Sequence, residues 1–388
     1  MEISACVKYV GVNDHQVDLF EGQYKVPNGM SYNSYVILDE KIAVMDTVDG
    51  FFTEEWLNNV EQVLGGKMPD YLIIQHMEPD HSASIPAFLK KYPKATVVST
   101  AKGFQFMEQF FPEFFAGQGL PAEQRIVAAN DGILELGQHS LHFVYAPMVH
   151  WPEVMMTYEA TEKILFAADG FGKFGALDVE EEWTDEARRY YIGIVGKYGP
   201  QVQAVLKKAA GLDIWTICSL HGPVLKENLG FYLEKYDRWS SYQPEEFGVV
   251  IAYASVYGNT RSAAEYLADV LQEKGQKTVL YDLARCDKAK AVADAFRYDR
   301  LVLAGITYNG DLFPCMRSFI EGLTERNYQN RKVAIIENGT WAPMAGKLIL
   351  GMFEKSKNLT FTETTVSVKS AMNEQNKGEI GKLAQELS

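Results

Sequence analysis

Short apolar runs alternate with polar loops along residues 1–245. Each run ends in a polar cluster, and short runs bounded in this way predict buried strands. The Asp39-Glu40 pair stands between two of the runs and predicts the turn of a β-hairpin. The expected strands cover residues 32–38, 41–46, 71–75, 95–99, 133–136, 141–146, 164–168 and 214–219.

The stretches between these runs carry helical signals. Thr53 is placed as the N-cap of a helix over residues 53–64, and Ser82 can cap another helix that begins a few residues later. A longer helical region covers residues 184–210. The first part of the chain is therefore expected to be a mixed α/β domain.

From residue 246 the pattern becomes that of a doubly wound α/β domain. A short polar connection that contains a proline, residues 240–246, precedes this change and is typical of a linker. A chain of 388 residues is also too long for one typical core. We therefore predict one domain over residues 1–245 and a second over residues 246–388. The expected strands of the second domain cover residues 248–253, 278–281, 301–305, 333–337 and 365–368.

The most unusual polar cluster is His-Met-Glu-Pro-Asp-His at residues 76–81, directly after the apolar run at residues 71–75. Its first histidine, its glutamate and its aspartate stand at alternating positions, so an extended backbone would aim all three the same way. Two imidazoles and two carboxylates in one segment form a set of metal ligands suited to iron, manganese or zinc. The alternative is a polar loop whose charges face water.

Three later strands also end at a potential ligand, namely His150, Asp169 and His221. Taken alone, His150 or Asp169 is as consistent with a structural role as with a role as a metal ligand. Together with the first cluster they give four His, two Asp and one Glu, which is too many for one tetrahedral zinc and enough for two metal ions. We assign structural roles to the three remaining histidines, His15, His139 and His142.

Three loops of the second domain follow predicted strands, where open α/β sheets bind their ligands. The hydroxyls, backbone amides and helix N-terminus of the first loop suit a terminal phosphate. Tyr308 and Trp341 could stack on a flat ring, and the alternative is that both pack within the domain. A dinucleotide site is disfavoured because no GxGxxG follows a strand. The candidate residues are Ser255, Tyr257, Gly258, Asn259, Thr260, Thr307, Tyr308, Asn309, Gly310, Asn338, Gly339 and Trp341.

Composition narrows the class of partner. A formal net charge of -14 argues against nucleic acids and anionic membranes. No stretch is long and apolar enough to span a membrane, and the first residues lack a signal-peptide pattern, so a cytoplasmic protein is expected. The absence of a CxxC pair excludes a built-in rubredoxin-type or zinc-ribbon module. We expect buried structural thiols, without disulfides, at Cys6, Cys218, Cys286 and Cys315.

The ordered motifs HxExDH, HWPE, a strand-end Asp and HGP, at residues 76–81, 150–153, 169 and 221–223, are similar to the metallo-β-lactamase-like domain of the flavodiiron proteins, or A-type flavoproteins. The three loops of the second domain resemble those of flavodoxin. The resemblance implies an αββα sandwich followed by a flavodoxin-like doubly wound parallel sheet. It also implies two cofactors, FMN and a pair of non-haem irons. Hydrolytic relatives usually carry a histidine in place of Glu78, and a carboxylate there favours iron over zinc.

Carried over by position, the resemblance divides the candidate ligands between the two irons. Asp169 would bridge the irons, and Asp169 and His81 are the residues to which it assigns a catalytic part. In some relatives the residue that matches His81 is not a close ligand, so direct ligation by His81 stays open. The two sets are His76, Glu78 and His150 for one iron and Asp80, His81 and His221 for the other.

The resemblance further implies an oxidoreductase in which FMN passes electrons to the diiron centre. The centre would reduce nitric oxide to N2O, dioxygen to water, or both. A head-to-tail homodimer, or a tetramer built from such dimers, would bring the FMN of one subunit to the irons of the other. Electrons would come from an external donor, either rubredoxin or a reduced deazaflavin.

The chain departs from many relatives near the irons. Gly170 and Phe174 stand where those relatives have an alanine and a histidine, and no histidine lies near Gly29. Tyr24 or Tyr191 could supply an O–H donor there instead. These changes leave the preference between nitric oxide and dioxygen open.

Two alternative functions remain. One is a zinc hydrolase of the metallo-β-lactamase superfamily fused to a flavodoxin-like domain, which Glu78 and the flavin loops disfavour. The other is a flavin-only electron carrier with a relic first domain, which the complete ligand set disfavours. The identity and stoichiometry of the bound metal would distinguish all three.

Overall fold

The computed structural model describes residues 3–117 and 119–388. The chain forms two compact units, one of Met1–Tyr191 with Pro200–Tyr236 and the other of Ile192–Gly199 with Asp237–Ser388. The domain boundary predicted at residue 245 stays a prediction, and each unit is described by itself. Among the described residues, no helix combines the length and the apolar character that crossing a bilayer requires.

Two sheets form the centre of the first unit. The first sheet has the order β1 (Val7–Tyr9), β6 (Tyr35–Ile37), β7 (Ala43–Met45), β8 (Tyr71–Ile73), β9 (Thr96–Ser99) and β10 (Arg125–Val127). The second has the order β11 (Ile133–Glu135), β12 (Ser140–Tyr145), β13 (Met155–Glu159), β14 (Ile164–Phe166) and β15 (Thr216–Cys218). Tyr35 of β6 lies opposite Met45 of the antiparallel β7, which confirms the predicted hairpin.

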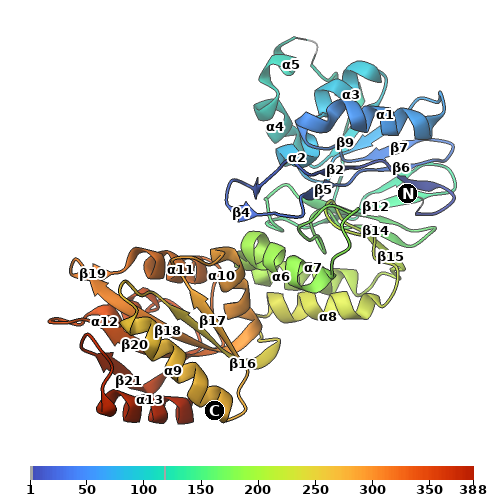
Figure 1. The fold of residues 1–388 in the computed structure, drawn as a ribbon. Coiled ribbons are helices and arrows are strands. Elements are labelled where there is room, and N and C mark those ends of the chain that lie inside the picture. The colour runs from blue at the N-terminus through green and yellow to red at the C-terminus, as the bar shows by residue number, and fades with distance from the viewer. Residues whose placement is uncertain (1–2, 118) are drawn as a thin grey trace. The chain divides into compact units, whose positions relative to one another are not determined.

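The two sheets pack face to face through apolar side chains. Tyr35 and Met45 of the first sheet share one core cluster with Phe143, Met155 and Phe166 of the second, and each of these side chains is at most 2% exposed. Helices lie on both outer sides of this pair of sheets (Figure 1), which gives the predicted αββα sandwich. They are α1 (Thr53–Leu64), α2 (Pro79–Ser82), α3 (Ile85–Lys91), α4 (Ala101–Phe110) and α5 (Pro112–Ala116) on one side, and α6 (Trp183–Tyr190), α7 (Gly199–Ala209) and α8 (Leu229–Ser240) on the other.

Short elements fill the connections. Two hairpin-like pairs precede β6, namely β2 (Val12–Asp14) with β5 (Met30–Tyr32) and β3 (Leu19–Phe20) with β4 (Tyr24–Lys25). The long helical region predicted from residue 184 is divided between α6 and α7 by a π-helical turn and a 3-10 turn over residues 191–198.

Both predicted helix caps were wrong. Thr53 is the first residue of α1, and its hydroxyl donates to the Gly50 carbonyl, because a 3-10 turn capped by Asp49 precedes the helix. Ser82 ends the four-residue helix α2, and its hydroxyl donates to the Met77 carbonyl. In both places a short turn that the pattern did not resolve comes directly before the predicted helix.

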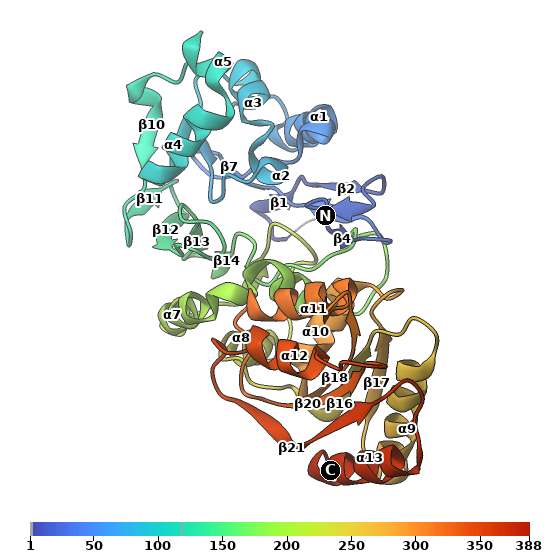
Figure 2. The same ribbon diagram turned by 90° about the vertical axis from the view of Figure 1, so that its left-hand side faces the viewer.

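A parallel sheet forms the centre of the second unit. Its order is β17 (Thr278–Asp282), β16 (Glu246–Tyr253), β18 (Tyr298–Tyr308), β20 (Arg331–Asn338) and β21 (Leu359–Val368), and the short β19 (Asp311–Leu312) pairs antiparallel with the end of β18. Figures 1 and 2 show α9 (Asn259–Glu273) and α13 (Glu374–Glu386) on one face, and α10 (Lys288–Arg297), α11 (Pro314–Thr324) and α12 (Ala345–Met352) on the other. This strand order is that of flavodoxin, as predicted. The chain adds β17 on one side of β16 and then adds β18, β20 and β21 on the other side, so the switch point of the sheet lies between β16 and β18.

The four cysteines are free thiols. Cys218 is buried in β15, but Cys6, Cys286 and Cys315 are half-buried. The prediction of four buried thiols was therefore wrong for three of them. Cys6 directly precedes β1 and Cys315 lies in the first turn of α11, and side chains at element ends are only partly covered.

Candidate functional site

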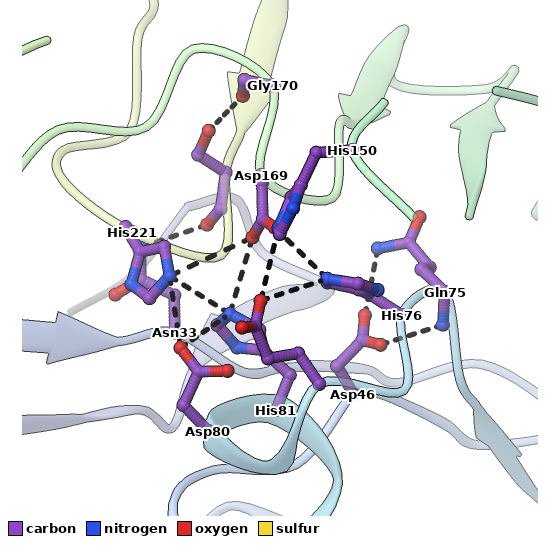
Figure 3. A network of polar contacts seen from close by, with 12 residues as sticks. Asn33, Asp46, Gln75, His76, Asp80, His81, His150, Asp169, Gly170 and His221 are labelled. Atoms are coloured by element: carbon purple, nitrogen blue, oxygen red, sulfur yellow. Dashed lines mark hydrogen bonds and ion pairs between the residues drawn. The ribbon is translucent and has the colours of Figure 1, made fainter. Parts of the chain in front are cut away.

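The side chains that the sequence marked as metal ligands lie at the carboxyl ends of strands in the first unit (Figure 3). Residues 76–81 follow β8, His150 follows β12, Asp169 follows β14 and His221 follows β15. β13 lies between β12 and β14 and is antiparallel to both, so β12 and β14 run in the same direction. β15 is parallel to β14, and these three strands therefore all end at the same edge of their sheet. The strand ends thereby bring distant parts of the sequence together.

The segment after β8 is extended only as far as Glu78, whose φ and ψ are -60° and 138°. Pro79 then opens α2, and its fixed φ suits the first position of a helix. The predicted alternation therefore holds for His76 and Glu78. It was wrong for Asp80, which lies on the helical turn and joins a different set of ligands.

The first ligand group consists of His76, Glu78, His150 and Asp169. Their ligand atoms all lie within 4.8 Å of one another. The Nε2 atom of His76 is 3.3 Å from both Glu78 Oε2 and Asp169 Oδ2. The Nε2 atom of His150 is 3.1 Å and 3.2 Å from the same two oxygens. Two imidazole nitrogens and two carboxylate oxygens thus surround one point.

The second ligand group consists of Asp80, His81 and His221, all of them buried. The two histidine Nε2 atoms are 3.0 Å apart, and Asp80 Oδ2 is 3.2 Å from that of His81 and 3.3 Å from that of His221. His81, whose participation the sequence left open, therefore points its Nε2 into this group.

Asp169 joins the two groups. Its Oδ2 faces the first group, while its Oδ1 is 3.3 Å from His81 Nε2 and 3.8 Å from His221 Nε2 (Figure 3). The side chain is 2% exposed. A carboxylate in this position can offer one oxygen to each of two metal ions.

The charges in the two groups are strongly coupled. Burial opposes protonation of His81, but Asp80 and Asp169 outweigh it and raise the pKa of His81 to about 10. Burial likewise opposes protonation of His150, while Asp169 and Glu78 raise its pKa to about 9. Burial favours the neutral form of Asp169, yet the imidazoles around it hold its pKa well below the usual range. In the metal-free protein, ionised carboxylates thus hold protons on His81 and His150.

The donor set fits two metal ions. Both oxygens of Asp80 and both oxygens of Asp169 are buried, and none of them makes a hydrogen bond of good geometry with the described part of the chain. Asp80 Oδ2 and both Asp169 oxygens face the imidazole nitrogens of the ligand groups instead. Buried carboxylate oxygens that lack well-aligned hydrogen bonds are costly, and a bound cation satisfies them. Imidazole and carboxylate ligands suit iron, manganese or zinc, and the carboxylate Glu78 among them shifts the preference towards iron.

Two buried groups that the sequence analysis did not single out orient the ligands. Glu153 is 2% exposed, and its Oε1 lies 2.7 Å from His76 Nδ1. The backbone carbonyl of Ser31 lies 2.7 Å from His221 Nδ1. Such partners fix each ring and leave its Nε2 free for a metal. The HWPE motif could have revealed Glu153, whereas a backbone carbonyl leaves no trace in the sequence.

Further polar contacts hold the loops that carry the ligands (Figure 3). The buried Asp46 accepts hydrogen bonds from the backbone and side-chain amides of Gln75 at 2.7 Å and 2.8 Å, directly before His76. The side-chain amide of Asn33 donates to carbonyls on either side of His221 at 2.9 Å and 2.8 Å. The ligands are therefore held by a rigid scaffold.

Aromatic rings surround the second ligand group. The ring of Tyr190 lies 5.4 Å from that of His221 and 5.2 Å from that of Phe174. Burial raises the pKa of Tyr190 well above its usual value, and Asp169 adds to this, so its hydroxyl stays neutral. Of the two tyrosines that the sequence suggested near the irons, Tyr24 packs on Phe174 at 5.5 Å and Tyr191 packs on a tyrosine of α8. Two tyrosines that the sequence analysis did not suggest are in ring contact with the ligand His221, namely Tyr190 at 5.4 Å and Tyr32 at 6.0 Å.

The second unit has a cavity of about 400 Å³ lined by the loops that follow β16, β18 and β20. All the predicted flavin-binding residues line it except Gly258, which precedes α9 with a φ of 91°. Trp341 is 91% exposed and does not pack within the domain, whereas Tyr308 is 48% exposed and its ring lies 5.3 Å from that of Phe313, so it packs there in part. Tyr257 in the first loop is 93% exposed. Exposed rings beside a helix N-terminus fit a flat ring with a phosphate tail.

Hydrogen bonds between the loops shape this cavity. The Thr307 hydroxyl accepts from two backbone amides at the start of α12 at 2.8 Å and 3.1 Å. The Asn338 side chain donates to the Thr260 hydroxyl at 3.2 Å and exchanges hydrogen bonds with the backbone of Ser370. Thr307 and Asn338 therefore hold the loops in place as well as lining the cavity.

Comparison with known proteins finds matches over most of the chain. The ODP family beta lactamase model matches residues 30–222, and a flavodoxin domain model matches residues 250–360. The anaerobic nitric oxide reductase flavorubredoxin of Vibrio vulnificus is 28% identical over 349 residues, which are 86% of this chain and 69% of that protein.

Solved structures resemble the chain over its full length. The flavodiiron protein of Giardia intestinalis is 25% identical with a TM-score of 0.87, and the match covers 100% of this chain and 96% of that one. Rubredoxin oxygen:oxidoreductase of Desulfovibrio gigas is 24% identical with a TM-score of 0.92, covering 100% and 97%.

Proposed function

The chain belongs to the flavodiiron proteins, and from that membership we propose that it passes electrons from FMN to a non-haem diiron centre and reduces nitric oxide to N2O, dioxygen to water, or both. The observation that carries the proposal is the meeting of two ligand groups at Asp169. A centre with one metal would need only one of these groups.

We assign one iron to the first ligand group, the other to the second, and the bridging position to Asp169. When bound, the irons supply Lewis-acid and redox chemistry and FMN supplies electrons. Asp169 and His81 are the proposed catalytic residues. Glu153 and the Ser31 carbonyl hold two of the imidazoles in orientation, and the rings of Tyr190 and Phe174 limit water around the second group.

For the flavin, we propose that the N-terminus of α9 and the hydroxyls beside it bind the phosphate of FMN. Tyr308 and Trp341 would stack against its ring system. The cavity lining supports this assignment, since both rings and the hydroxyls of Ser255 and Thr260 face the same space. FMN content of purified Trp341→Ala protein tests it, because loss of a stacking ring should leave the flavin easily removed by dialysis.

The two sites lie in separate units of one chain, and we propose that a head-to-tail homodimer, alone or within a tetramer, pairs FMN of one subunit with the irons of another. The proposed electron donor is external, either rubredoxin or a reduced deazaflavin, and the proposed location is the cytoplasm. Undiminished turnover per chain after dilution to monomers would contradict the dimer.

Gas consumption by the reduced protein tests the function directly. The purified chain is assayed for iron and FMN, reduced chemically without oxygen, and mixed separately with nitric oxide and with dioxygen. Rapid loss of either gas supports the proposal and ranks the substrates. No consumption of either gas by a protein that holds zinc instead of iron would favour a hydrolase.

Iron uptake by the metal-free protein is expected to release protons and to tighten as the pH rises. The pKa values of His81 and His150 lie at about 10 and about 9, so both imidazoles are protonated at neutral pH and must lose their protons on binding iron. At pH values below 9, each displaced proton should weaken iron binding about tenfold for every unit by which the pH is lowered. Calorimetry in buffers of different ionisation enthalpy measures the number of protons released. Affinity that does not change between pH 6 and pH 8 would contradict the prediction.

Replacing Glu153 by Gln is expected to weaken iron binding in the first ligand group by about 10–100-fold. The amide keeps the size of the side chain but removes the negative charge next to His76 Nδ1, which makes that imidazole a weaker ligand. Competition with a chelator measures the affinity of each iron. The second group serves as the internal control, and equal loss from both groups would indicate general damage instead.

A further inference from the structure

A third cluster of possible metal ligands lies in the first unit, formed by Cys6, His139 and Glu162. Their ligand atoms all lie within 4.8 Å of one another. Cys6 directly precedes β1, His139 lies in the turn between β11 and β12, and Glu162 lies in the turn between β13 and β14. Three segments far apart in the sequence, from both sheets of the sandwich, thus meet at one place.

This cluster is at the opposite end of the strands from the candidate diiron centre. His139 precedes β12 and Glu162 precedes β14, whereas His150 and Asp169 follow those same strands. Strand β12, Ser140–Tyr145, alone spans roughly 17 Å at about 3.4 Å per residue. The cluster therefore cannot share a ligand with the diiron centre and forms a site of its own.

The imidazole of His139 is held as a metal-bound histidine usually is. The residue is 4% exposed, and its Nδ1 lies 2.8 Å from Asp39 Oδ2, which also accepts the His139 backbone N–H at 2.7 Å. Burial opposes the ionisation of Asp39, but its hydrogen bonds with His139 outweigh this and lower its pKa. An ionised carboxylate on one ring nitrogen fixes the ring and leaves the other nitrogen, Nε2, facing Glu162 at 3.7 Å.

Two features of the cluster call for a cation. Glu162 Oε2 is buried and has no hydrogen-bond partner among the described residues. The Cys6 thiol lies within 4.8 Å of the ligand atoms of His139 and Glu162, so one ion can reach all three. A divalent ion would satisfy the carboxylate oxygen and would deprotonate the thiol on binding.

We propose that Cys6, His139 and Glu162 bind a zinc ion, with Asp39 positioning the histidine and the fourth coordination place open to water. Thiolate, imidazole and carboxylate together are a ligand set typical of zinc, and the thiolate makes this site softer than the all-nitrogen-and-oxygen diiron centre. The ion would tie the segment before β1 to two turns of the second sheet. It would thereby stabilise the edge of the sandwich without taking part in gas reduction.

Cobalt titration of the iron-loaded full-length protein tests this proposal. Cobalt bound by a thiolate gives a near-ultraviolet charge-transfer band, and none of the ligands assigned to the diiron centre is a cysteine, so the band identifies a sulfur site even if some cobalt exchanges with iron. We expect a band that saturates at about one cobalt per chain and disappears when zinc is added. It should be absent in Cys6→Ser and unchanged in Cys286→Ser, which removes another half-buried thiol outside the cluster.

Two measurements on a second variant, Glu162→Gln, test the proposal independently of whether Cys6→Ser folds correctly. Glu162→Gln should weaken zinc binding by at least about tenfold, and zinc should raise the melting temperature of the parent protein more than that of this variant. Iron content should be the same in both. No band in the parent protein, a band that survives in Cys6→Ser, or equal zinc affinity in the parent and Glu162→Gln would each overturn the proposal.

Discussion

Replacing Asp169 by Asn is expected to prevent assembly of a paired iron centre and to lower gas consumption by at least about 1000-fold. Two dications about 3.5–4 Å apart repel each other strongly, and a bridging carboxylate offsets this with a negative charge between them. Asp169 is the side chain that faces both ligand groups with a separate oxygen. Asparagine fills the same space, but it is neutral and turns an N–H donor towards imidazoles that must accept a metal. Iron per chain and the rate of nitric oxide or dioxygen loss measure the effect.

The Asp178→Asn variant provides a matched control for this experiment. It makes the same chemical change in the same unit at a side chain that is 56% exposed and pairs with His15. Its iron content and activity should equal those of the parent protein. The FMN content of Asp169→Asn should also be unchanged, since the flavin cavity is formed by the second unit alone. An Asp169→Asn protein that keeps two irons and loses less than about tenfold in activity would show that Asp169 is not the bridge.

The sequence could predict the location of the metal centre because each ligand comes directly after an apolar run. The carboxyl ends of neighbouring strands meet at a sheet edge, so a ligand after each run implies a cluster. What residue spacing alone could not predict is the direction of individual side chains, and the grouping of Asp80 with His81 and His221 was expected only from the family resemblance. Pro79 starts a helical turn and carries Asp80 into the second ligand group, although residue spacing alone placed it with His76.

Contacts between distant segments were beyond the sequence analysis for a different reason. Tyr190 lies in ring contact with His221 because α6 packs near the end of β15, and neither residue signals the other in the sequence. His139 was assigned a structural role because no carboxylate motif stands beside it, yet the fold brings Asp39 and Glu162 to its two ring nitrogens. Motifs reveal ligands that share a segment, and clusters built from separate turns become visible only once the strands are paired.

The connection predicted as a linker shows the same limitation. Residues 240–246 read as a short polar link, but Tyr242 within it is 7% exposed. Its hydroxyl donates to the Gly196 carbonyl at 3.0 Å, and its own carbonyl accepts from Arg331 at 2.7 Å. All three residues belong to the second unit, so this part of the connection is anchored to that unit. The anchoring depends on a buried arginine that hydrophobic patterning could not identify.

Replacing Arg331 by Met is expected to destabilise the second unit by about 3–5 kcal/mol. The guanidinium is 3% exposed and donates to carbonyls of the linker, of the end of α10, of the start of β18 and of the turn before β20, so it ties four segments together. Methionine fills much of the volume but leaves those buried carbonyls without a donor, at about 1–3 kcal/mol for each one that water does not reach. Urea unfolding followed by the release of FMN reports on this unit, and its midpoint should fall by about 1.5–2 M.

Lys332→Met is the matched control, because it removes the neighbouring cation of the same strand. Lys332 is half-buried, and its Nζ donates to the Glu386 carbonyl at 2.7 Å, so its loss should cost about 1 kcal/mol or less. The urea midpoint of Arg331→Lys should lie between those of the two methionine variants. A single ammonium keeps the charge but cannot reach all the carbonyls that the planar guanidinium contacts. If Arg331→Met unfolds at the same urea concentration as Lys332→Met, the stability of the second unit rests on its apolar core alone. A lower midpoint for Arg331→Met with unchanged iron content would place the loss in the second unit and show that the buried guanidinium holds the linker and β20 together.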